Sequence, residues 1–248
     1  MNLLSALDSP GGLVCVVGGG GKTTTMYALA SRVDNAIVTA TVRIPRFDRS
    51  VSELIVTETP TAVLDEHSKQ AFPLGLVPET EGKHRYRGYE PETVDAIAER
   101  HDGPVFVKSD GARMRDFKAP AAHEPRIPDS TDLVVPVVSS HVVGKPLTGH
   151  WVHRPDRVSE LTETEMGDEI TPDTVGRVLA HPDGGFRNVP EGTTVIPLIT
   201  KVDGEEHERA ANAIATAVYD HLDDSSVEVP RVAFARFDAF DAVEHPTE

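Results

Sequence analysis

Short runs of apolar residues alternate along this chain with stretches in which apolar residues recur every three or four positions. The short runs are typical of buried strands, and the wider spacing is typical of amphipathic helices. Alternation of the two kinds predicts βαβ units and a mostly parallel sheet. The predicted strands cover residues 13–17, 36–40, 53–56, 105–107, 133–138 and 194–199.

Three helices are predicted by the same criterion. The first follows four consecutive glycines, and its apolar stripe is Met26, Leu29, Ala30 and Val33. The second covers 91–100, where a proline suits the first helical turn. The third covers 205–222 and starts with two glutamates, which the helix dipole favours there. Its expected apolar face is Ala210, Ala213, Ile214, Ala217 and Val218.

The pattern is that of a single α/β domain over residues 1–240, since a chain of this length forms one large core. Residues 66–90 hold several glycines, prolines and basic residues and are read as a long loop or a small inserted excursion. Residues 241–248 are read as a flexible tail. Pro136 and Pro197 fall inside predicted strands, so those strands are expected to be edges or to begin later.

Acidic residues dominate the charge of the chain. Forty aspartates and glutamates outnumber seven lysines and seventeen arginines, and the net charge is −16. A lysine-poor, acidic surface suits a salt-rich cytoplasm, where ions screen self-repulsion, so we infer a halophilic host over an acidic mesophile. The same charge argues against nucleic acid as the main partner. Four of the few lysines lie in loop motifs bearing glycine, proline or aspartate: Lys22, Lys118, Lys145 and Lys201.

The chain lacks the signals of secreted and membrane proteins. No apolar run approaches the ~20 residues that span a bilayer, and the start has no signal-peptide pattern. We therefore expect a cytoplasmic protein with no membrane contact. The single cysteine, Cys15, excludes an internal disulfide and a Cys-only zinc site, and it is expected in the core.

The strongest chemical signal is a glycine run between the first strand and the first helix, Val16-Val17-Gly18-Gly19-Gly20-Gly21-Lys22-Thr23-Thr24. Glycines let the backbone aim N–H groups at phosphates, and the helix N-terminus adds partial positive charge. Lys22 is expected to reach the β and γ phosphates and Thr23 to bind Mg²⁺. The match is to the variant x-G-G-x-G-K-T-T, with Val17 where its extra lysine would stand. A flexible loop without a ligand is the alternative.

This motif predicts a P-loop NTPase-like, three-layer α/β fold. The candidate phosphate-binding residues are Gly18, Gly19, Gly20, Gly21, Lys22, Thr23 and Thr24.

A second motif, Thr200-Lys201-Val202-Asp203, follows the last predicted strand. It matches the [NT]-K-x-D pattern that reads guanine, in which the carboxylate accepts two N–H groups that adenine cannot offer. Lys201 and Asp203 are therefore candidate base-binding residues. The alternative is a plain strand-to-helix turn.

A third motif places Asp110 directly after the strand at 105–107, and Gly111 follows it. An aspartate there suits binding of Mg²⁺ or of a bridging water opposite the glycine run. Lys22 and Asp110 are thus the candidate catalytic residues, and Thr23 and Asp110 the candidate Mg²⁺ ligands. Asp-Gly is also an ordinary turn. Thr39 and Thr41 end the second strand and are weaker candidates for the metal shell.

Four histidines could suggest a metal site: His123, His141, His150 and His153. The spacing of His150 and His153 is compatible with ligation. Because no cysteine or H-E-x-x-H pattern accompanies them, scattered surface histidines are the preferred interpretation.

Taken together, these motifs resemble the YqeC family, described as selenium-dependent hydroxylase accessory proteins, over roughly residues 10–225. Besides the motifs above, the likeness rests on Asp110-Gly111-Ala112-Arg113, Lys118-Ala119-Pro120, His123-Glu124-Pro125, Gly144-Lys145-Pro146-Leu147 and Val152-His153-Arg154-Pro155. The resemblance implies a P-loop nucleotide-binding fold and a link to the maturation of molybdenum-containing hydroxylases. The family tends to have Glu-Ala before Asp110, where this chain has Lys108-Ser109. No residue here indicates selenium.

The expected function is a Mg²⁺-dependent nucleotide-binding protein, a slow NTPase or switch, with GTP slightly ahead of ATP. A client molybdenum hydroxylase is the partner that the resemblance implies, and loops 118–128 and 144–154 are expected to face the substrate or that client. A homodimer is compatible with a loop of this type. Two alternatives stay open: a kinase or nucleotidyltransferase acting on a small molecule such as a pterin cofactor, and a non-catalytic module that binds nucleotide only for its shape.

Overall fold

The computed structural model describes residues 3–7, 11–65, 71–222, 227–236 and 240–244. The helices are α1 (Leu3–Ala6), α2 (Lys22–Ala30), α3 (Pro60–Asp65), α4 (Pro91–Arg100), α5 (Pro155–Leu161), α6 (Pro172–Ala180) and α7 (Glu205–Asp220), and a 3₁₀ helix, η1, covers Ser140–Val142. The main sheet contains β1 (Leu13–Gly18), β2 (Ile37–Ala40), β4 (Glu53–Val56), β5 (Leu74–Val77), β8 (Val105–Lys108), β10 (Leu133–Ser139), β12 (Thr194–Val195), β13 (Leu198–Thr200), β14 (Arg231–Ala235) and β15 (Phe240–Glu244). Two smaller sheets are formed by β3 (Ile44–Pro45), β6 (Thr80–Glu81) and β7 (Arg85–Tyr86), and by β9 (Phe117–Lys118) and β11 (Val152–His153).

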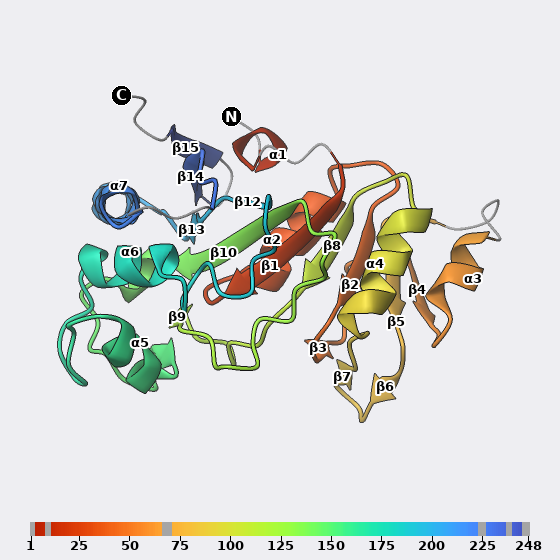
Figure 1. Cartoon of the computed structure of the whole chain (residues 1–248), viewed down its shortest axis with the longest axis horizontal. Coiled ribbons are helices and arrows are strands. Elements are labelled where there is room, and N and C mark those ends of the chain that lie inside the picture. The colour runs from red at the N-terminus through yellow and green to blue at the C-terminus, as the bar shows by residue number, and fades with distance from the viewer. Residues whose placement is uncertain (1–2, 8–10, 66–70, 223–226, 237–239, 245–248) are drawn as a thin grey trace.

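The main sheet runs in the order β15-β14-β13-β10-β1-β8-β2-β5-β4, and β12 adds to β10 beside β13 (Figure 1). Its pairings are parallel except between β14 and β15. The mostly parallel sheet that the sequence predicts is confirmed. Because β1 lies in its middle, the loop that follows β1 emerges among the carboxyl ends of β8, β10 and β13.

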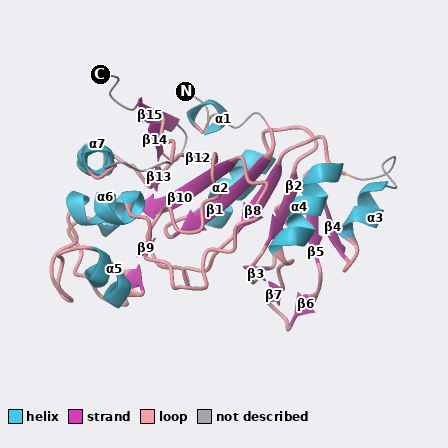
Figure 2. Cartoon of the chain, viewed as in Figure 1, coloured by secondary structure: helices cyan, strands magenta, loops and turns pink. Residues whose placement is uncertain are grey.

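Helices cover both faces of the sheet, as Figures 1 and 2 show. Alternate side chains of β1 point to opposite faces. Val14 and Val16 pack in the core cluster that contains Met26 and Leu29 of α2. The intervening side chains pack with α4, in the cluster that contains Leu13, Cys15, Val17, Val94 and Ile97. Helices α5, α6 and α7 belong to a third cluster beside β13 and β14.

The predicted elements are largely confirmed, including the bounds of β4 and α4. The apolar face of α7 differs in detail from the expectation. Ala213 is exposed, whereas Ala211 and Ala215 are buried with Ile214 and Val218. Alanine on both sides of the helix leaves the edges of the apolar stripe ambiguous in the sequence, and packing against α6 decides them.

Two expectations about irregular segments are corrected. Residues 74–77, read as part of a loop or excursion over 66–90, form β5 between β2 and β4 in the main sheet. Residues 241–244, read as tail, belong to β15, which pairs with β14. The sequence Leu-Gly-Leu-Val of β5 is short and contains a glycine, so its strand character depends on its neighbours. Residues 66–70 and 245–248 lie outside the described part of the chain.

The two strand prolines have a common explanation. Pro136 lies in the interior strand β10, contrary to the edge or late start expected for it. On the side of β10 that faces β12 and β13, Val134 O accepts from Ile196 N at 3.0 Å. Backbone polar groups of a strand point to alternate sides from one residue to the next, so the Pro136 nitrogen faces the same side as Val134 O. The neighbouring strand is interrupted there by Pro197, between β12 and β13. The missing N–H of Pro136 thus faces a gap in the ladder.

None of the helices in the described residues is long and apolar enough to cross a membrane.

Candidate functional site

The glycine loop joins the central strand β1 to α2. β1 ends at Gly18 and α2 begins at Lys22, so the strand–loop–helix arrangement predicted from the sequence is confirmed. Gly21 caps the helix with φ 128°, a backbone conformation that side chains strongly disfavour. The positive end of α2 therefore faces the carboxyl edge of the sheet, where an anion would be stabilised.

Residues 111–116, here called the strap, lie against the glycine loop. The Gly20 N–H donates to Arg115 O at 2.9 Å. A Cβ on Gly19 would lie 2.9 Å from that same oxygen, so no larger residue fits. Asp116 O accepts from Ser139 N at 3.0 Å, which joins the strap to the end of β10. Close packing thus requires glycine at these positions independently of any phosphate.

The tip of the strap is strained and exposed. Arg113 and Met114 have φ of 47° and 62°, in the left-handed region, and Met114 is 99% exposed. At its end, the Asp116 carboxylate forms an ion pair with Lys201 at 2.5 Å. The strap therefore contacts both the glycine loop and the Thr200–Asp203 loop.

Lys22 and Asp110, the two candidate catalytic residues, contact each other in the structure. The Lys22 ammonium, in a residue that is 6% exposed, lies 3.1 Å from Asp110 Oδ1 and also donates to Gly18 O. The other carboxylate oxygen, Oδ2, accepts the Gly18 N–H at 2.8 Å. Asp110 is thus joined to both ends of the glycine loop.

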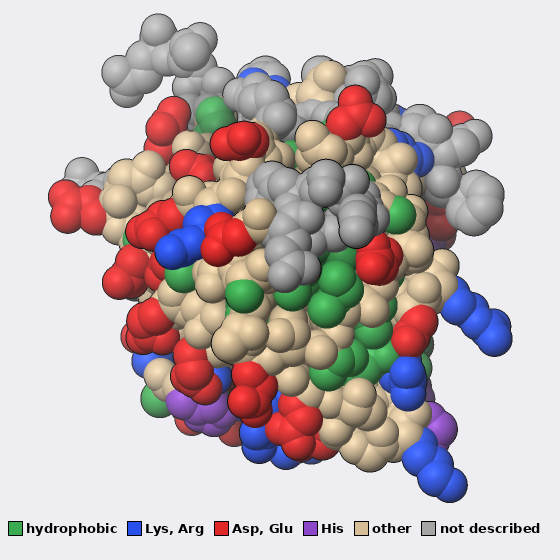
Figure 3. Space-filling model, turned by 90° about the vertical axis from the view of Figure 1, so that its right-hand side faces the viewer, with side chains coloured by type: hydrophobic (Ala, Val, Ile, Leu, Met, Phe, Trp, Pro, Cys, Tyr) green, Lys and Arg blue, Asp and Glu red, His purple; other side chains and the backbone are tan. Residues whose placement is uncertain are grey.

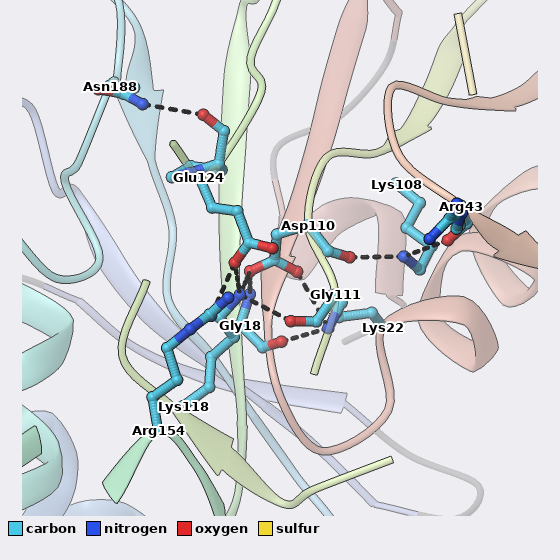
Figure 4. A network of polar contacts seen from close by, with 11 residues as sticks. Gly18, Lys22, Arg43, Lys108, Asp110, Gly111, Lys118, Glu124, Arg154 and Asn188 are labelled. Atoms are coloured by element: carbon cyan, nitrogen blue, oxygen red, sulfur yellow. Dashed lines mark hydrogen bonds and ion pairs between the residues drawn. The ribbon is translucent and has the colours of Figure 1, made fainter. Parts of the chain in front are cut away.

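A second buried lysine, Lys118, reaches the same carboxylate (Figure 4). Its ammonium lies 3.0 Å from Asp110 Oδ2. It also donates to Gly111 O and to Glu124 Oε2, each at 2.7 Å. Glu124 Oε2 accepts a further bond from Arg154 at 2.9 Å. Lys118, Glu124 and Arg154 thus extend the Lys22–Asp110 pair into a network.

The small β9–β11 sheet brings this network together. Lys118 ends β9, and it pairs with the last residue of β11, which directly precedes Arg154. The loop that carries Glu124 is held from the far side, because Asn188 donates to Pro125 O at 2.9 Å (Figure 4). The network therefore depends on segments that are distant in the sequence.

Lys108, the last residue of β8, is a third buried lysine beside the site. Its ammonium donates to Asp110 O at 2.5 Å and to Arg43 O at 3.0 Å. Both acceptors are backbone carbonyls, so Lys108 shapes the turn after β8.

Burial and charge act in opposite directions at this site. Burial by itself raises the pKa of Asp110, but Lys22 and Lys118 outweigh it and hold that pKa well below its usual range. The pKa of Lys22 is lowered, because burial outweighs the attraction of Asp110. Burial, with repulsion from Lys22, lowers the pKa of Lys108 to about 7. The site is thus a buried environment in which charge interactions are strong.

The same positive field extends to the outer side of the network. Burial raises the pKa of Glu124, but Lys118 and Arg154 outweigh it and lower the pKa overall. Burial, together with Arg154 and Lys118, lowers the pKa of His153 to about 4. His153 is therefore neutral near pH 7.

The Thr200–Asp203 loop touches the glycine loop. The Thr200 hydroxyl, at the end of β13, donates to Gly20 O and lies 3.2 Å from Val138 O. Lys201 has φ 57° and turns its ammonium to the strap, as described above. Asp203 is exposed, and its carboxylate has no ion-pair partner among the described residues. The two predicted binding motifs are therefore neighbours, and the hydrogen bond between them comes from Thr200.

Thr39 and Thr41 have structural partners. Their hydroxyls donate to Leu76 O at 2.8 Å and to Arg126 O at 2.6 Å, respectively. Both residues are buried, so they tie β2 to neighbouring segments.

The four histidines have different surroundings. His123 and His150 are exposed, and His141 stacks on His207 of α7 with ring centroids 4.2 Å apart. Among the described residues, no group of three or more His, Cys, Asp or Glu side chains could hold a metal ion.

Thr23 and Asp110 carry oxygen atoms of the kind that bind Mg²⁺ beside a polyphosphate. The Thr23 hydroxyl is half-buried at the start of α2 and has no hydrogen-bond partner among the described residues. Asp110 lies beside the glycine loop, with its oxygens on Lys22, Lys118 and Gly18 N. Hydroxyl and carboxylate oxygens fit a cation that keeps several waters and phosphate ligands. The donor set fits Mg²⁺ if Asp110 gives up a lysine partner.

A recess opens beside Asp110 and Lys118. Gly18 and Val137 of the sheet edge form one wall, and Val178 and Gly185 lie on the side of α6.

Sequence reasoning found Lys22, Asp110 and the glycines, but it assigned no individual role to Glu124 or Arg154. It expected only that their loops face the substrate or a client protein. The signal was present, because Lys118, Glu124 and Arg154 all lie in the segments that carry the family resemblance. What the sequence did not show is that these segments turn inward onto Asp110.

Comparisons with known proteins agree with these motifs. A family model described as YqeC protein matches residues 14–156, which include the glycine loop and the whole Asp110–Arg154 network. An uncharacterized protein YqeC from Escherichia coli (strain K12) is 26% identical over 216 residues, covering 84% of this chain and 83% of that protein. No solved structure gives a significant match. Since the family model covers more than half of the sequence, the chain belongs to the YqeC family.

Proposed function

We propose that this protein binds a nucleoside triphosphate with Mg²⁺ at the carboxyl edge of its sheet and acts as a slow NTPase or switch, with GTP favoured over ATP. The observation that carries the proposal is the glycine loop, which runs from the central strand into α2 with Lys22 on the Asp110 carboxylate. Backbone N–H groups, a helix N-terminus and a lysine are the groups that bind a phosphate chain.

The order of the strands supports a P-loop NTPase-like fold. β1 lies between β8, which Asp110 closely follows, and β10, whose other side pairs with β12 and β13. These strands are parallel, so their following loops gather at one edge. Phosphate-binding, metal-binding and base-reading residues on those loops would face one ligand.

The contact between Thr200 and Gly20 supports a base-reading role for the Thr200–Asp203 loop. It holds that loop beside the glycine loop, so a base read by Asp203 would belong to a nucleotide whose phosphates lie on Lys22. Asp203 is exposed and free of an ion-pair partner among the described residues, so its carboxylate is accessible to a base.

Charge in the site also supports an anionic ligand. Three cationic side chains (Lys22, Lys118 and Arg154) gather around two carboxylates, Asp110 and Glu124, in a protein of net charge −16. A local excess of positive charge in a buried site attracts anions strongly. A polyphosphate would offset this excess.

In this role Lys22 orients and neutralises the phosphates, and Asp110 holds their counter-ion or the attacking water. Bound Mg²⁺ would supply charge neutralisation to the phosphates. We also propose, from the family resemblance, that the client is a molybdenum hydroxylase. Residues of loops 118–128 and 144–154 that do not turn inward, such as His123 and His150, are exposed for such a partner.

Titration with fluorescent GTP and ATP analogues, with Mg²⁺ in molar KCl, tests the proposal. Lys22→Ala removes a charge-assisted contact to phosphate and is expected to weaken both nucleotides at least about tenfold. Asp203→Asn is expected to weaken only GTP, by about tenfold to hundredfold, because guanine loses a charged acceptor. Asp220→Asn, on the exposed end of α7, is the matched control and should change nothing.

Three outcomes would redirect the proposal. Equal binding of ATP and GTP with a silent Asp203→Asn reduces the Thr200–Asp203 loop to a turn. A stable phosphorylated or nucleotidylated small molecule favours the kinase or nucleotidyltransferase alternative. Absence of binding by the wild-type protein contradicts nucleotide binding by the isolated chain.

A further inference from the structure

Lys118 is a buried lysine that the glycine-loop chemistry does not itself require. Its side chain is 1% exposed, and lysines are rarely buried so fully because the ammonium loses its hydration. Two carboxylates offset that cost, Asp110 at 3.0 Å and Glu124 at 2.7 Å. A charge kept in the interior at this cost calls for a reason beyond stability.

Lys118 and Lys22 hold the same carboxylate. Lys22 contacts Asp110 Oδ1 at 3.1 Å, and Lys118 contacts Oδ2 at 3.0 Å. The two ammonium groups are therefore close to each other, on either side of one small anion. A phosphate group that reaches Lys22 also enters the field of Lys118.

The far side of Lys118 is anchored separately. Glu124 accepts from Lys118 and from Arg154, and Asn188 holds the loop that follows Glu124. Lys118 therefore keeps one ion pair if it leaves Asp110. This arrangement lets the Lys118 ammonium move a short way while it keeps its ion pair with Glu124.

We propose that Lys118 is a second phosphate-binding lysine, which turns from Asp110 to the phosphates when a nucleotide binds while Glu124 and Arg154 keep it in place. The inference rests on the proposed function and adds a residue from β9 to the phosphate site. Release of Asp110 from its lysines also frees that carboxylate for the role given to it above.

Binding of nucleoside mono-, di- and triphosphates, each with Mg²⁺ and with EDTA, tests this role. Lys118→Met keeps the length of the side chain and removes its charge. Triphosphate affinity is expected to fall about tenfold to hundredfold, diphosphate affinity less, and monophosphate affinity not at all. The loss should persist in EDTA, because the contact is with phosphate. Lys118→Arg should recover part of the affinity.

Lys108→Met is the matched control. Lys108 is as buried as Lys22, but its ammonium donates to two backbone carbonyls, Asp110 O and Arg43 O. Its removal should leave the dependence on phosphate number unchanged. Thermal unfolding of each variant separates loss of binding from loss of fold.

Several results would overturn the proposal. If Lys118 only positions Asp110, the loss of triphosphate affinity in Lys118→Met disappears in EDTA. If Lys118 only stabilises the fold, the affinities for all three nucleotides fall equally. Should Lys118→Met fail to fold, Lys118→Gln takes its place, and wild-type triphosphate affinity in that variant contradicts the proposal. If the wild-type protein binds nucleotide and Lys118→Met binds it equally well, this inference alone is wrong. If the wild-type protein binds no nucleotide, the proposed function is wrong as well.

Discussion

Asp110 is the residue at which the glycine loop, the strap and the Lys118 network meet. Its two carboxylate oxygens contact the ammonium groups of Lys22 and Lys118 and accept the Gly18 N–H. Removal of one partner from such a buried group is costly, because the remaining charge is left without compensation. Substitutions here are therefore expected to change stability as well as binding, and controls for folding are needed in every experiment on the site.

Cys15 gives a prediction about pH. It lies fully buried in β1, and burial, which outweighs its hydrogen bond with Thr131, raises its pKa from 9.0 to about 11. Between these values the unfolded chain has lost the thiol proton and the folded chain has kept it. Stability therefore falls as pH rises from about 9 to about 11, by up to roughly 2–3 kcal/mol relative to Cys15→Ala.

Urea unfolding of wild type and Cys15→Ala across this pH range measures that difference. Cys15→Ala has its own pH-independent cost from the lost volume, so the slopes are compared and not the absolute values. Parallel curves for the two proteins would contradict the raised pKa.

At the scale of elements, the strap connects the two predicted binding loops. Its backbone accepts from Gly20, and its Asp116 pairs with Lys201. A nucleotide that uses the Gly20 N–H must displace Arg115 O, and one that uses Lys201 must compete with Asp116. We therefore predict that the proposed contacts of a nucleotide with Gly20 and with Lys201 are coupled through this one short segment.

Asp116→Asn is expected to raise the association rate of nucleotide a few-fold with little change in the dissociation rate. The reason is that Lys201 is 42% exposed, so this ion pair contributes at most about 1 kcal/mol and can be lost without damage to the fold. Stopped-flow mixing with a fluorescent nucleotide measures both rates. Glu79→Gln, which breaks the exposed pair with Arg87 beside the small β3–β7–β6 sheet, is the control. A slower association in Asp116→Asn would show that the strap orders the site instead of restraining it.

At the scale of the whole molecule, the surface and the candidate site differ in the sign of their charge. Acidic side chains are spread over the face seen from the β4 edge (Figure 3), and the net charge of the chain is −16. The cationic groups of the site lie inside, on one edge of the sheet. Salt therefore screens the repulsion at the surface more than the ion pairs within the site.

The melting temperature is accordingly expected to rise between about 0.1 M and molar KCl, because screening relieves the self-repulsion of the surface. Differential scanning fluorimetry across this range measures it. Sucrose at matched osmolality stabilises by exclusion without screening charge and serves as the control. A melting temperature that is flat in KCl would contradict both the repulsion and the inferred halophilic host.

The sequence by itself determined the features that depend on neighbouring residues. The alternation of apolar runs predicted most strands of the sheet, and the glycine run before Lys22 predicted a loop between a strand and a helix, because backbone freedom and helix termini are local properties. Strands β5, β14 and β15 were missed. For the glycine-bearing β5 and the end strand β15, strand character comes from the neighbours they pair with.

Only the tertiary structure decided where Lys118, Glu124 and Arg154 point, and that an interior strand tolerates Pro136. The three charged residues were visible as motifs, but their meeting at Asp110 depends on the pairing of β9 with β11. Pro136 is accommodated by an interruption in a strand some sixty residues later in the chain. Both depend on contacts between distant segments, for which a local pattern carries no signal.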